Sequence, residues 1–347
     1  MSDSQSTTAG QAIFDRTEDD TGKLDLVLEG GGVKGVALVG AVNWLREHGY
    51  PEVQRVAGTS AGAIAAALIA AKMSPEHMKK VIRDMPYARF QQAGFLPRLG
   101  WPGKGLAVLL NGGIYKTDYL HKWITDQLAS RDVHTWRDLK DHDSRADQTL
   151  PPHLRYRLVV VVSDITRGRM LRLPWDYREL CDCDPDDIPV ADAVTASAAI
   201  PFFFRTRTMR CGPALKKEAL TLVDGGVLSN YPIDIFDRQD DQPSRWPTLG
   251  VKLSAKKALV EQCHPINNSV DIVKNLIATM RNAHDNLHID DKSVQDRTVF
   301  VDTSGVSATD FTMLPATRDS LFDRGQSAAE GFLKDWNWEL WKKEHRR

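Results

Sequence analysis

A lone serine between an apolar run and an alanine-rich segment is the feature that most constrains the fold. The apolar run is Val53–Ala57, and the segment after the serine continues with small and aliphatic residues to Ala71, which predicts a helix. A sharp strand-to-helix turn exposes the side chain at its apex when small residues stand two positions before and after it. The sequence therefore predicts Ser60 as a nucleophile at the end of a buried strand. The predicted nucleophile elbow consists of Gly58, Thr59, Ser60, Ala61 and Gly62.

Apolar runs rich in Val and Leu recur along the chain and alternate with helical patterns. The predicted strands are Leu24–Leu28, Val53–Ala57, Arg157–Ser163, Leu220–Val223, Leu249–Leu253 and Thr298–Asp302. The predicted helices are Val36–His48, the segment after Ser60, Pro75–Met85, Lys116–Ser130, Val270–His288 and Arg318–Trp336. This alternation favours a three-layer α/β fold, in which a mainly parallel central sheet has helices on both faces.

Length and composition fit one elaborated globular domain. The chain has 347 residues, of which 42% are hydrophobic and 26% charged. We expect residues 1–22 to be a disordered tail, because they are polar and acidic and lack the apolar region of a Sec signal peptide. Residues 23–347 are expected to form a single catalytic domain, with its core motifs in 24–236 and C-terminal strands and helices in 248–345. No apolar run approaches the roughly 18–20 residues of a membrane span.

The charge balance and the cysteine spacing argue against nucleic acid and metal as partners. The 45 Lys and Arg residues balance 46 Asp and Glu residues, so no general electrostatic attraction to nucleic acid is expected. The C-x-C spacing of Cys181 and Cys183 lacks the gap of zinc sites, and Cys211 and Cys263 stand apart. We therefore expect reduced thiols, no metal and no cofactor, in a cytoplasmic protein.

Two segments depart from the alternation of strands and helices. Pro86–Tyr115 combines three prolines and six glycines with aromatic residues. It is either an irregular surface connection or, beside the predicted site, a mobile lid or a lipid-contacting flap. Asp141–Pro152 is polar, and we expect an exposed loop there. Near the C-terminus three tryptophans stand beside a basic cluster, where they either pack on the domain or anchor it at a membrane interface: Trp336, Trp338 and Trp341.

A glycine cluster follows the first predicted strand and formally satisfies G-x-G-x-x-G. Its residues are Gly30, Gly31, Gly32, Val33, Lys34 and Gly35. A dinucleotide site would also need an acidic residue at the end of the second strand, and Val53–Ala57 runs into Gly58 instead. Consecutive glycines with a helix behind them can turn several N–H groups toward one point, which suits an oxyanion. Lys34 either adds positive field there or points to solvent.

A serine nucleophile needs a base, and two kinds of candidate are present. Histidine is the usual base, but His284 and His288 stand among Asn and Asp residues, where solvated or capping roles are favoured, and His264 is the remaining late histidine. Asp224 directly ends the apolar strand Leu220–Val223, at the sheet edge where α/β folds place their chemistry. Gly225 and Gly226 follow it and leave room for a neighbouring group.

The three motifs, in this order and spacing, resemble those of the patatin-like phospholipase family, and bacterial members in particular. The resemblance covers Leu24 to Phe236 and includes the block Ala196–Phe204. It implies a Ser60–Asp224 dyad without histidine, with an oxyanion hole formed by the N–H groups of Gly31, Gly32 and Val33. It further implies phospholipase A-type cleavage of membrane-lipid acyl esters through an acyl-enzyme, with transient contact at a membrane surface and no cofactor.

Three aromatic residues and two alternative functions remain to be weighed. The side chains that either line an acyl pocket or belong to the ordinary core are Phe202, Phe203 and Phe204. The first alternative to the hydrolase is a non-catalytic or regulatory lipid-binding protein on the same fold. The second is a nucleotide-binding oxidoreductase that uses the glycine cluster, which leaves Ser60 and Asp224 without a role.

Overall fold

An eight-stranded mixed sheet forms the centre of the part of the chain that the computed structural model describes, which is residues 22–90, 113–140, 151, 154–210, 219–238, 244–254 and 291–345. The strand order is β10-β9-β1-β2-β4-β8-β7, with β5 beside β4. A separate two-stranded parallel sheet pairs β3 with β6. The strands are β1 Lys23–Leu28, β2 Glu52–Thr59, β3 Gly113–Tyr115, β4 Leu158–Asp164, β5 Arg169–Leu173, β6 Phe202–Phe204, β7 Arg207–Met209, β8 Leu220–Asp224, β9 Thr248–Lys252 and β10 Thr298–Phe300.

The expectation of a mainly parallel sheet is confirmed. Neighbours are parallel from β10 through β9, β1 and β2 to β4. All six predicted strands are present, as β1, β2, β4, β8, β9 and β10. The pattern did not predict that β8 runs antiparallel to β4, nor the antiparallel strands β5 and β7.

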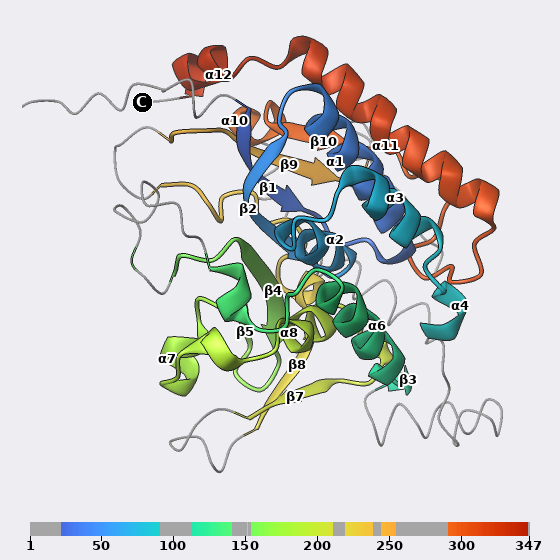
Figure 1. Cartoon of the computed structure of the whole chain (residues 1–347), viewed down its shortest axis with the longest axis vertical. Helices are drawn as coiled ribbons and strands as arrows, with labels where there is room; N and C mark the ends of the chain where they lie inside the picture. Colours follow the sequence, from blue (N-terminus) through green and yellow to red (C-terminus); the bar gives the residue numbers. More distant parts are fainter. Residues whose placement is uncertain are drawn as a thin grey trace, which may run out of the picture.

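Helices surround the sheet, as expected (Figure 1). Predicted helices appear as α1, α2, α3, α6 and α11, whereas Val270–His288 lies outside the described residues. Figure 1 shows α1 with α3 and α11 on one side of the blue end of the sheet, and α2 between the sheet and α6. The helices are α1 Gly35–His48, α2 Ala61–Ala70, α3 Pro75–Arg83, α4 Tyr87–Phe90, α6 Asp118–Ala129, α7 Tyr177–Cys181, α8 Val190–Ser197, α10 Lys292–Gln295, α11 Pro315–Asp335 and α12 Trp338–His345.

Both faces of the central strands are buried. In β1, Leu24, Leu26 and Leu28 belong to the large core that contains α1 and α2. Val27 points to the opposite face, where it joins a smaller cluster with Tyr231 and other residues. Successive strand residues face opposite sides, so a covered central strand is apolar on both faces except where a polar group is paired, as Asp25 is with Arg55.

The register of β4 brings the ends of two other strands together. On one edge β4 pairs with β5 over Val160–Asp164. β2 pairs with the first part of β4, up to Val161, and β8 pairs with the last part of β4, from Val162 onward. β5 occupies one edge of β4 beside both of these parts, so β2 and β8 must share the other edge. The carboxyl ends of β2 and β8 therefore meet there. This arrangement places Ser60, just after β2, next to Asp224, the last residue of β8.

Several expectations fall outside the described residues. These are the N-terminal tail except Gly22, the middle of Pro86–Tyr115, most of Asp141–Pro152, and Cys211 and Cys263. The domain boundaries therefore stay predictions. Cys183 is a free thiol whose pKa is raised, chiefly by burial. Among the described helices, none combines the length and the apolar character that crossing a membrane would take.

Candidate active site

The turn at Ser60 has the geometry expected of a nucleophile elbow. Ser60 has φ 56° and ψ −123°, outside the regions that ordinary residues adopt. A Cβ on Gly58 would lie 2.3 Å from the carbonyl oxygen of Gly62, and a Cβ on Gly62 would lie 2.3 Å from that of Leu28. Both flanking positions therefore require glycine. Backbone strain of this kind costs about 1–3 kcal/mol and persists where the surroundings hold it in place.

Ser60 and Asp224 are in direct contact. The Ser60 hydroxyl donates a hydrogen bond of 2.6 Å to Oδ2 of Asp224. The Gly226 N–H donates to Oδ1 of the same carboxylate at 2.8 Å, which fixes its orientation. Both side chains are buried, and the distance is within the range for proton transfer between a nucleophile and its base. The geometry thus pairs the predicted nucleophile with the predicted aspartate.

A third residue, Ser197, supports the strained turn. Its hydroxyl accepts a hydrogen bond from the Ser60 N–H at 2.8 Å and donates one to the Val161 carbonyl at 2.6 Å. Ser197 is fully buried at the end of α8. It therefore connects the nucleophile to β4, the strand that aligns β2 with β8. Ser197 lies in the block Ala196–Phe204 that resembles the family, but the sequence does not predict this contact.

The glycine loop lies beside the nucleophile, and its N–H groups differ in their hydrogen bonding. A Cβ on Gly30 would lie 3.1 Å from the Ser60 Cβ. The N–H groups of Gly30, Lys34 and Gly35 bond to carbonyl oxygens. For Gly31 and Gly32, the described residues provide no N–H acceptor. Gly32 has φ +56° and lines the cavity that contains Ser60.

The structure places Val33 and Lys34 differently from the two glycines before them. The Val33 N–H donates to the Ala308 carbonyl at 3.0 Å, so in this structure it is already engaged. Lys34 is near Asp302, whose pKa is lowered first by the Ser304 N–H and further by the charges of Arg324 and Lys34. Lys34 is absent from the residues that line the cavity.

A buried polar cluster holds the glycine loop from behind. The Glu29 carboxylate bonds to the Lys252 ammonium and to the Leu253 N–H at the end of β9. Asn230, six residues after Asp224, donates to the Glu29 carboxylate at 3.2 Å and to the Gly30 carbonyl at 3.1 Å. Breaking a buried ion pair of this kind is strongly destabilising, so the loop is firmly fixed.

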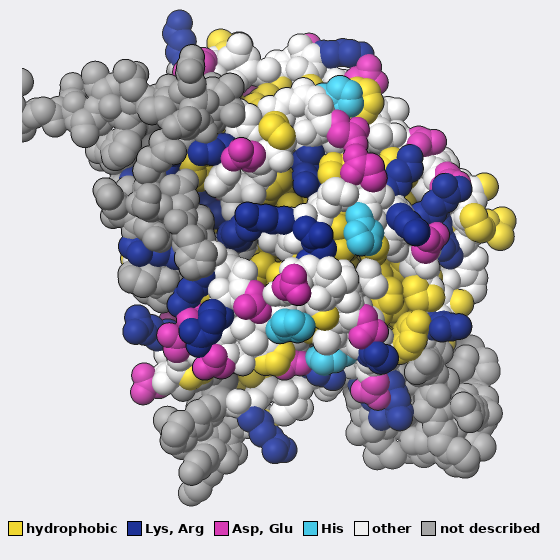
Figure 2. All heavy atoms as spheres, in the orientation of Figure 1, with side chains coloured by type: hydrophobic (Ala, Val, Ile, Leu, Met, Phe, Trp, Pro, Cys, Tyr) yellow, Lys and Arg dark blue, Asp and Glu magenta, His cyan; other side chains and the backbone are white. Residues whose placement is uncertain are grey.

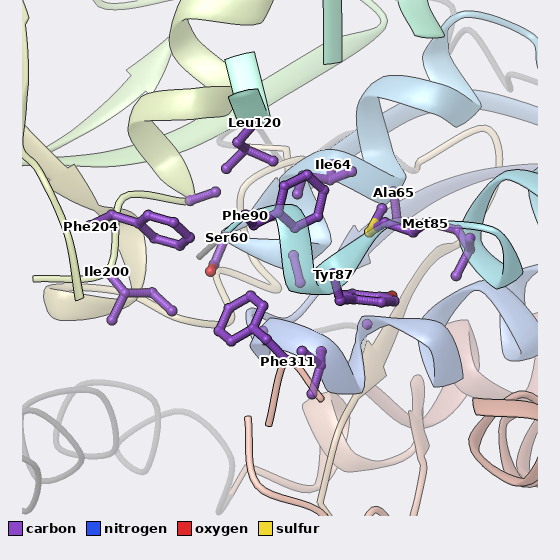
Figure 3. A pocket seen from close by; sticks show the side chains of 16 residues that line it. Ser60, Ile64, Ala65, Met85, Tyr87, Phe90, Leu120, Ile200, Phe204 and Phe311 are labelled. Carbon is purple, nitrogen blue, oxygen red and sulfur yellow. The ribbon is translucent and has the colours of Figure 1, made fainter. Parts of the chain in front are cut away.

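An apolar cavity opens at Ser60 (Figure 3). Its interior volume is about 50 Å³, within about 550 Å³ of space between atoms that includes open solvent. Among the described residues, no charged side chain lines it, and burial raises the pKa of Tyr87 far above its usual value, so that hydroxyl stays neutral. The walls come from the glycine loop, α2, α3, α4, α6, the residues around β6 and the segment that contains Phe311. The larger apolar side chains are Ile64, Ile82, Met85, Tyr87, Phe90, Leu120, Ile200, Phe204 and Phe311.

The three phenylalanines expected at the pocket have three different environments. Phe204 lines the cavity. Phe203 stands behind the wall, where its ring stacks on Phe311 at 4.8 Å. Phe202 is 45% exposed, so it belongs neither to the pocket nor to the core. Phe311, which no local motif identifies, also lines the cavity, and its ring contacts that of Phe204.

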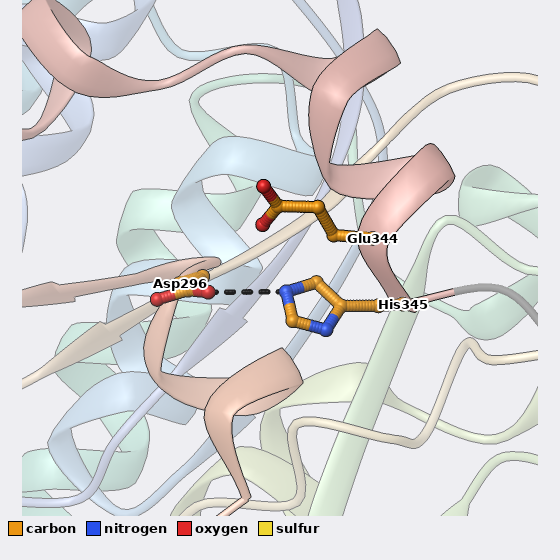
Figure 4. A group of neighbouring side chains, drawn as sticks. All are labelled: Asp296, Glu344 and His345. Carbon is orange, nitrogen blue, oxygen red and sulfur yellow. Dashed lines mark hydrogen bonds and ion pairs between the residues drawn. The ribbon is translucent and has the colours of Figure 1, made fainter.

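One other cluster has the residue types of a metal site. Ligand atoms of Asp296, Glu344 and His345 lie within 4.8 Å of one another (Figure 4). His345 Nε2 and Asp296 Oδ2 are hydrogen-bonded at 3.0 Å, and Glu344 is exposed. This bond fastens α12 to the residue that follows α10, so we interpret the cluster as structural.

Replacing Ser197 with alanine should lower kcat by about 10- to 100-fold, because the Ser60 N–H and the Val161 carbonyl both lose their partner and the turn relaxes. Steady-state kinetics on a water-soluble ester would show the loss in kcat, with little change in KM. Thr195→Ala is the matched control, since it removes a buried hydrogen bond from the same helix, to the Ala191 carbonyl. An equal loss of kcat in Ser197→Ala and Thr195→Ala would show that Ser197 contributes only to general stability.

Comparison with known proteins gives a consistent assignment. The model of the patatin-like phospholipase family matches residues 26–237. The uncharacterized protein YqhO of Bacillus subtilis is 34% identical over 319 residues, which are 91% of this chain and 99% of YqhO. The probable lipid hydrolase 463L of Invertebrate iridescent virus 6 is 22% identical, over 70% of this chain and 75% of its own length.

Similarity to solved structures is found at low sequence identity. VipD from Legionella pneumophila has a TM-score of 0.52 and 17% identity, over 90% of this chain and 66% of VipD. ExoU, in its complex with SpcU from Pseudomonas aeruginosa, has a TM-score of 0.45 and 21% identity, over 90% of this chain and 51% of ExoU. This chain thus spans between half and two thirds of those proteins. The match to the family model over well over half of the sequence shows that the chain belongs to the patatin-like phospholipase family.

Proposed function

We propose that this protein is a lipid acyl hydrolase of phospholipase A type, which cleaves fatty-acyl esters of membrane lipids. The observation that carries the proposal is the 2.6 Å hydrogen bond from Ser60 to Asp224 at an apolar cavity. Family membership and the relative named a probable lipid hydrolase support it. The intact pair also favours catalysis over a purely lipid-binding role. No observation in the described residues favours a nucleotide site.

The first half of the reaction forms an acyl-enzyme. Asp224 accepts the proton of the Ser60 hydroxyl while the oxygen attacks the ester carbonyl carbon. The oxyanion that develops receives hydrogen bonds from the N–H groups of Gly31 and Gly32, and donors of this kind are worth about 3–4 kcal/mol each. The positive end of α2, which begins at Ala61, adds to this field. Asp224 then protonates the departing alcohol, and the acyl group stays on Ser60.

The second half releases the fatty acid. A water molecule attacks the acyl carbonyl and gives its proton to Asp224, with the same N–H groups at the oxyanion. Collapse of the intermediate returns that proton to the Ser60 oxygen and frees the acid. No histidine takes part in either half, because one carboxylate accepts and donates the proton in turn.

The cavity sets the expected substrate class. Its uncharged, apolar wall suits a hydrocarbon chain, because apolar surface buried on binding is favourable by roughly 25 cal/mol per Å². The ester carbonyl then lies at Ser60 with the chain inside and the rest of the lipid outside. The proposal retains the expectation of a cytoplasmic protein that contacts membranes transiently.

Filling the cavity should shorten the preferred acyl chain. Ala65 lies on α2, little more than one turn after Ser60, and lines the cavity (Figure 3). In Ala65→Leu the added methyl groups occupy space that a long chain needs. We expect kcat/KM to fall about tenfold or more for long-chain p-nitrophenyl esters and to stay near the wild-type value for the acetate. An equal fall for every chain length would contradict this assignment of the acyl site.

The experiment that tests the function is mass spectrometry of the products from phospholipid vesicles. Wild-type protein should release free fatty acid and the matching lysophospholipid, and Ser60→Ala should release neither. Release that is unaffected by Ser60→Ala, or no release from any lipid offered to folded wild-type protein, would refute the proposal.

A further inference from the structure

The C-terminal tryptophans pack on the domain, although Trp336 and Trp341 stay partly exposed. Trp336 Nε1 donates to the Tyr50 hydroxyl at 2.7 Å, and Trp341 Nε1 donates to the Ser293 carbonyl at 3.0 Å. Trp338 is buried and stacks on Trp341. These contacts favour the packing interpretation over an interfacial anchor. A surface that meets lipid must therefore be sought elsewhere.

Large apolar side chains are exposed at four places in the described residues. Ile165 and Leu340 are each 51% exposed, Phe202 is 45% exposed and Leu314 is 68% exposed. Ile165 lies in the turn after β4, and Leu340 lies on α12. Phe202 and Leu314 both adjoin elements that form the apolar cavity at Ser60, which distinguishes them from isolated surface hydrophobic residues.

Phe202 is held outward beside one wall of the cavity. It begins β6, whose last residue, Phe204, lines the cavity, and between them Phe203 stacks on Phe311. Phe202 has φ +65°, which is rare for a bulky residue. Such strain lowers the folding equilibrium constant by about a factor of ten or more. Its presence therefore points to a function for the outward-facing ring.

Leu314 stands beside another wall of the same cavity. It precedes α11 and follows the cavity residue Phe311 by three positions. Arg318, one turn into α11, donates to the carbonyls of Arg83 and Met85, and its guanidinium lies 4.8 Å from the Tyr87 ring. The start of α11 is thereby fixed against the wall made by α3 and α4. Figure 2 shows hydrophobic side chains between α3, α4 and α6, and again where α11 begins.

We propose that Phe202 and Leu314 form a docking rim that inserts into the surface of a phospholipid bilayer and aligns the cavity with it. This inference rests on the proposed function, since a lipid hydrolase must take its substrate from a membrane. Every methylene of an acyl chain that crosses water carries a free-energy cost, which a cavity mouth pressed against the hydrocarbon avoids. Phe202 and Leu314 flank the stacked pair Phe203 and Phe311 at the edge of the cavity, and exposed apolar side chains beside an apolar cavity fit the hydrocarbon of a lipid surface.

The test compares rim variants with a matched surface variant in two assays. The variants are Phe202→Ser, Leu314→Ser, their double variant and Leu340→Ser, which removes an equally exposed side chain from α12. The first assay is co-sedimentation with phosphatidylcholine vesicles, carried out in the Ser60→Ala background so that no turnover occurs. The second is the ratio of fatty-acid release from those vesicles to hydrolysis of p-nitrophenyl acetate, with Ser60 intact.

The double variant should bind vesicles at least tenfold more weakly and lower the activity ratio to a similar degree. Leu340→Ser should change neither, and Phe202→Trp should preserve binding. Wild-type binding and ratio in a folded double variant would overturn the rim. Because co-sedimentation needs no catalysis, an inactive wild-type protein that still binds through Phe202 and Leu314 would refute the proposed function and not the rim.

Discussion

Ser60→Ala is expected to abolish ester hydrolysis, with a loss in kcat on the order of 10⁶-fold. The proposed reaction proceeds through an ester bond to the Ser60 oxygen, and nothing in the variant can form it. Loss of a serine nucleophile in comparable enzymes has effects of this size, and the residual rate comes from the oxyanion site and from binding. Measurement of kcat on a soluble ester, with fatty-acid release from vesicles alongside, would show the loss.

Folding must be separated from chemistry in this variant. The substitution removes one hydroxyl and adds nothing, and it keeps the Ser60 N–H that bonds to Ser197. We expect the thermal midpoint to stay close to that of the wild type or to rise, since strained catalytic turns often lower stability. A folded Ser60→Ala protein that retains substantial turnover would show that another group is the nucleophile.

Asp224→Asn is the second substitution with a large expected effect, a loss in kcat on the order of 10⁴-fold. The asparagine has the same shape and preserves an acceptor for the Gly226 N–H, but it cannot take the proton of Ser60. Binding of the acyl chain is unaffected, so KM should change little. Kinetics on a soluble ester of matched chain length would separate the two parameters.

The matched control for the base is a histidine variant. His284→Ala should leave kcat unchanged, because the proposed mechanism assigns proton transfer to Asp224 alone. Turnover that survives in Asp224→Asn and fails in His284→Ala would replace the dyad with a serine–histidine arrangement.

Much of the fold follows from local patterns, and the pairing of strands does not. The apolar runs identified β1, β2, β4, β8, β9 and β10, because burial on both faces leaves a continuous hydrophobic signature. Such a run carries no information about direction, so the antiparallel entry of β8 against β4 was not predictable. That entry is what brings Asp224 to Ser60 over 164 positions in the sequence.

The candidate site divides in the same way. Ser60, Asp224 and the glycine loop each belong to a motif that constrains its own backbone, so the sequence identifies them. Ser197 lies in the block Ala196–Phe204, but its role, like that of Phe311, depends on contacts between distant segments that no local pattern shows. The sequence identifies Phe202, Phe203 and Phe204 as pocket candidates, but which of these rings faces the cavity depends on how β6 packs.

The most direct test of the central claim is the site at which a fluorophosphonate probe labels the protein. Peptide mapping by mass spectrometry should find one adduct, on the Ser60 oxygen, that forms quickly in the wild type and very slowly in Asp224→Asn. This result is predicted because the probe reacts with a serine only when a neighbouring base activates it. An adduct on a different residue, or equal labelling rates in the two proteins, would contradict the Ser60–Asp224 dyad.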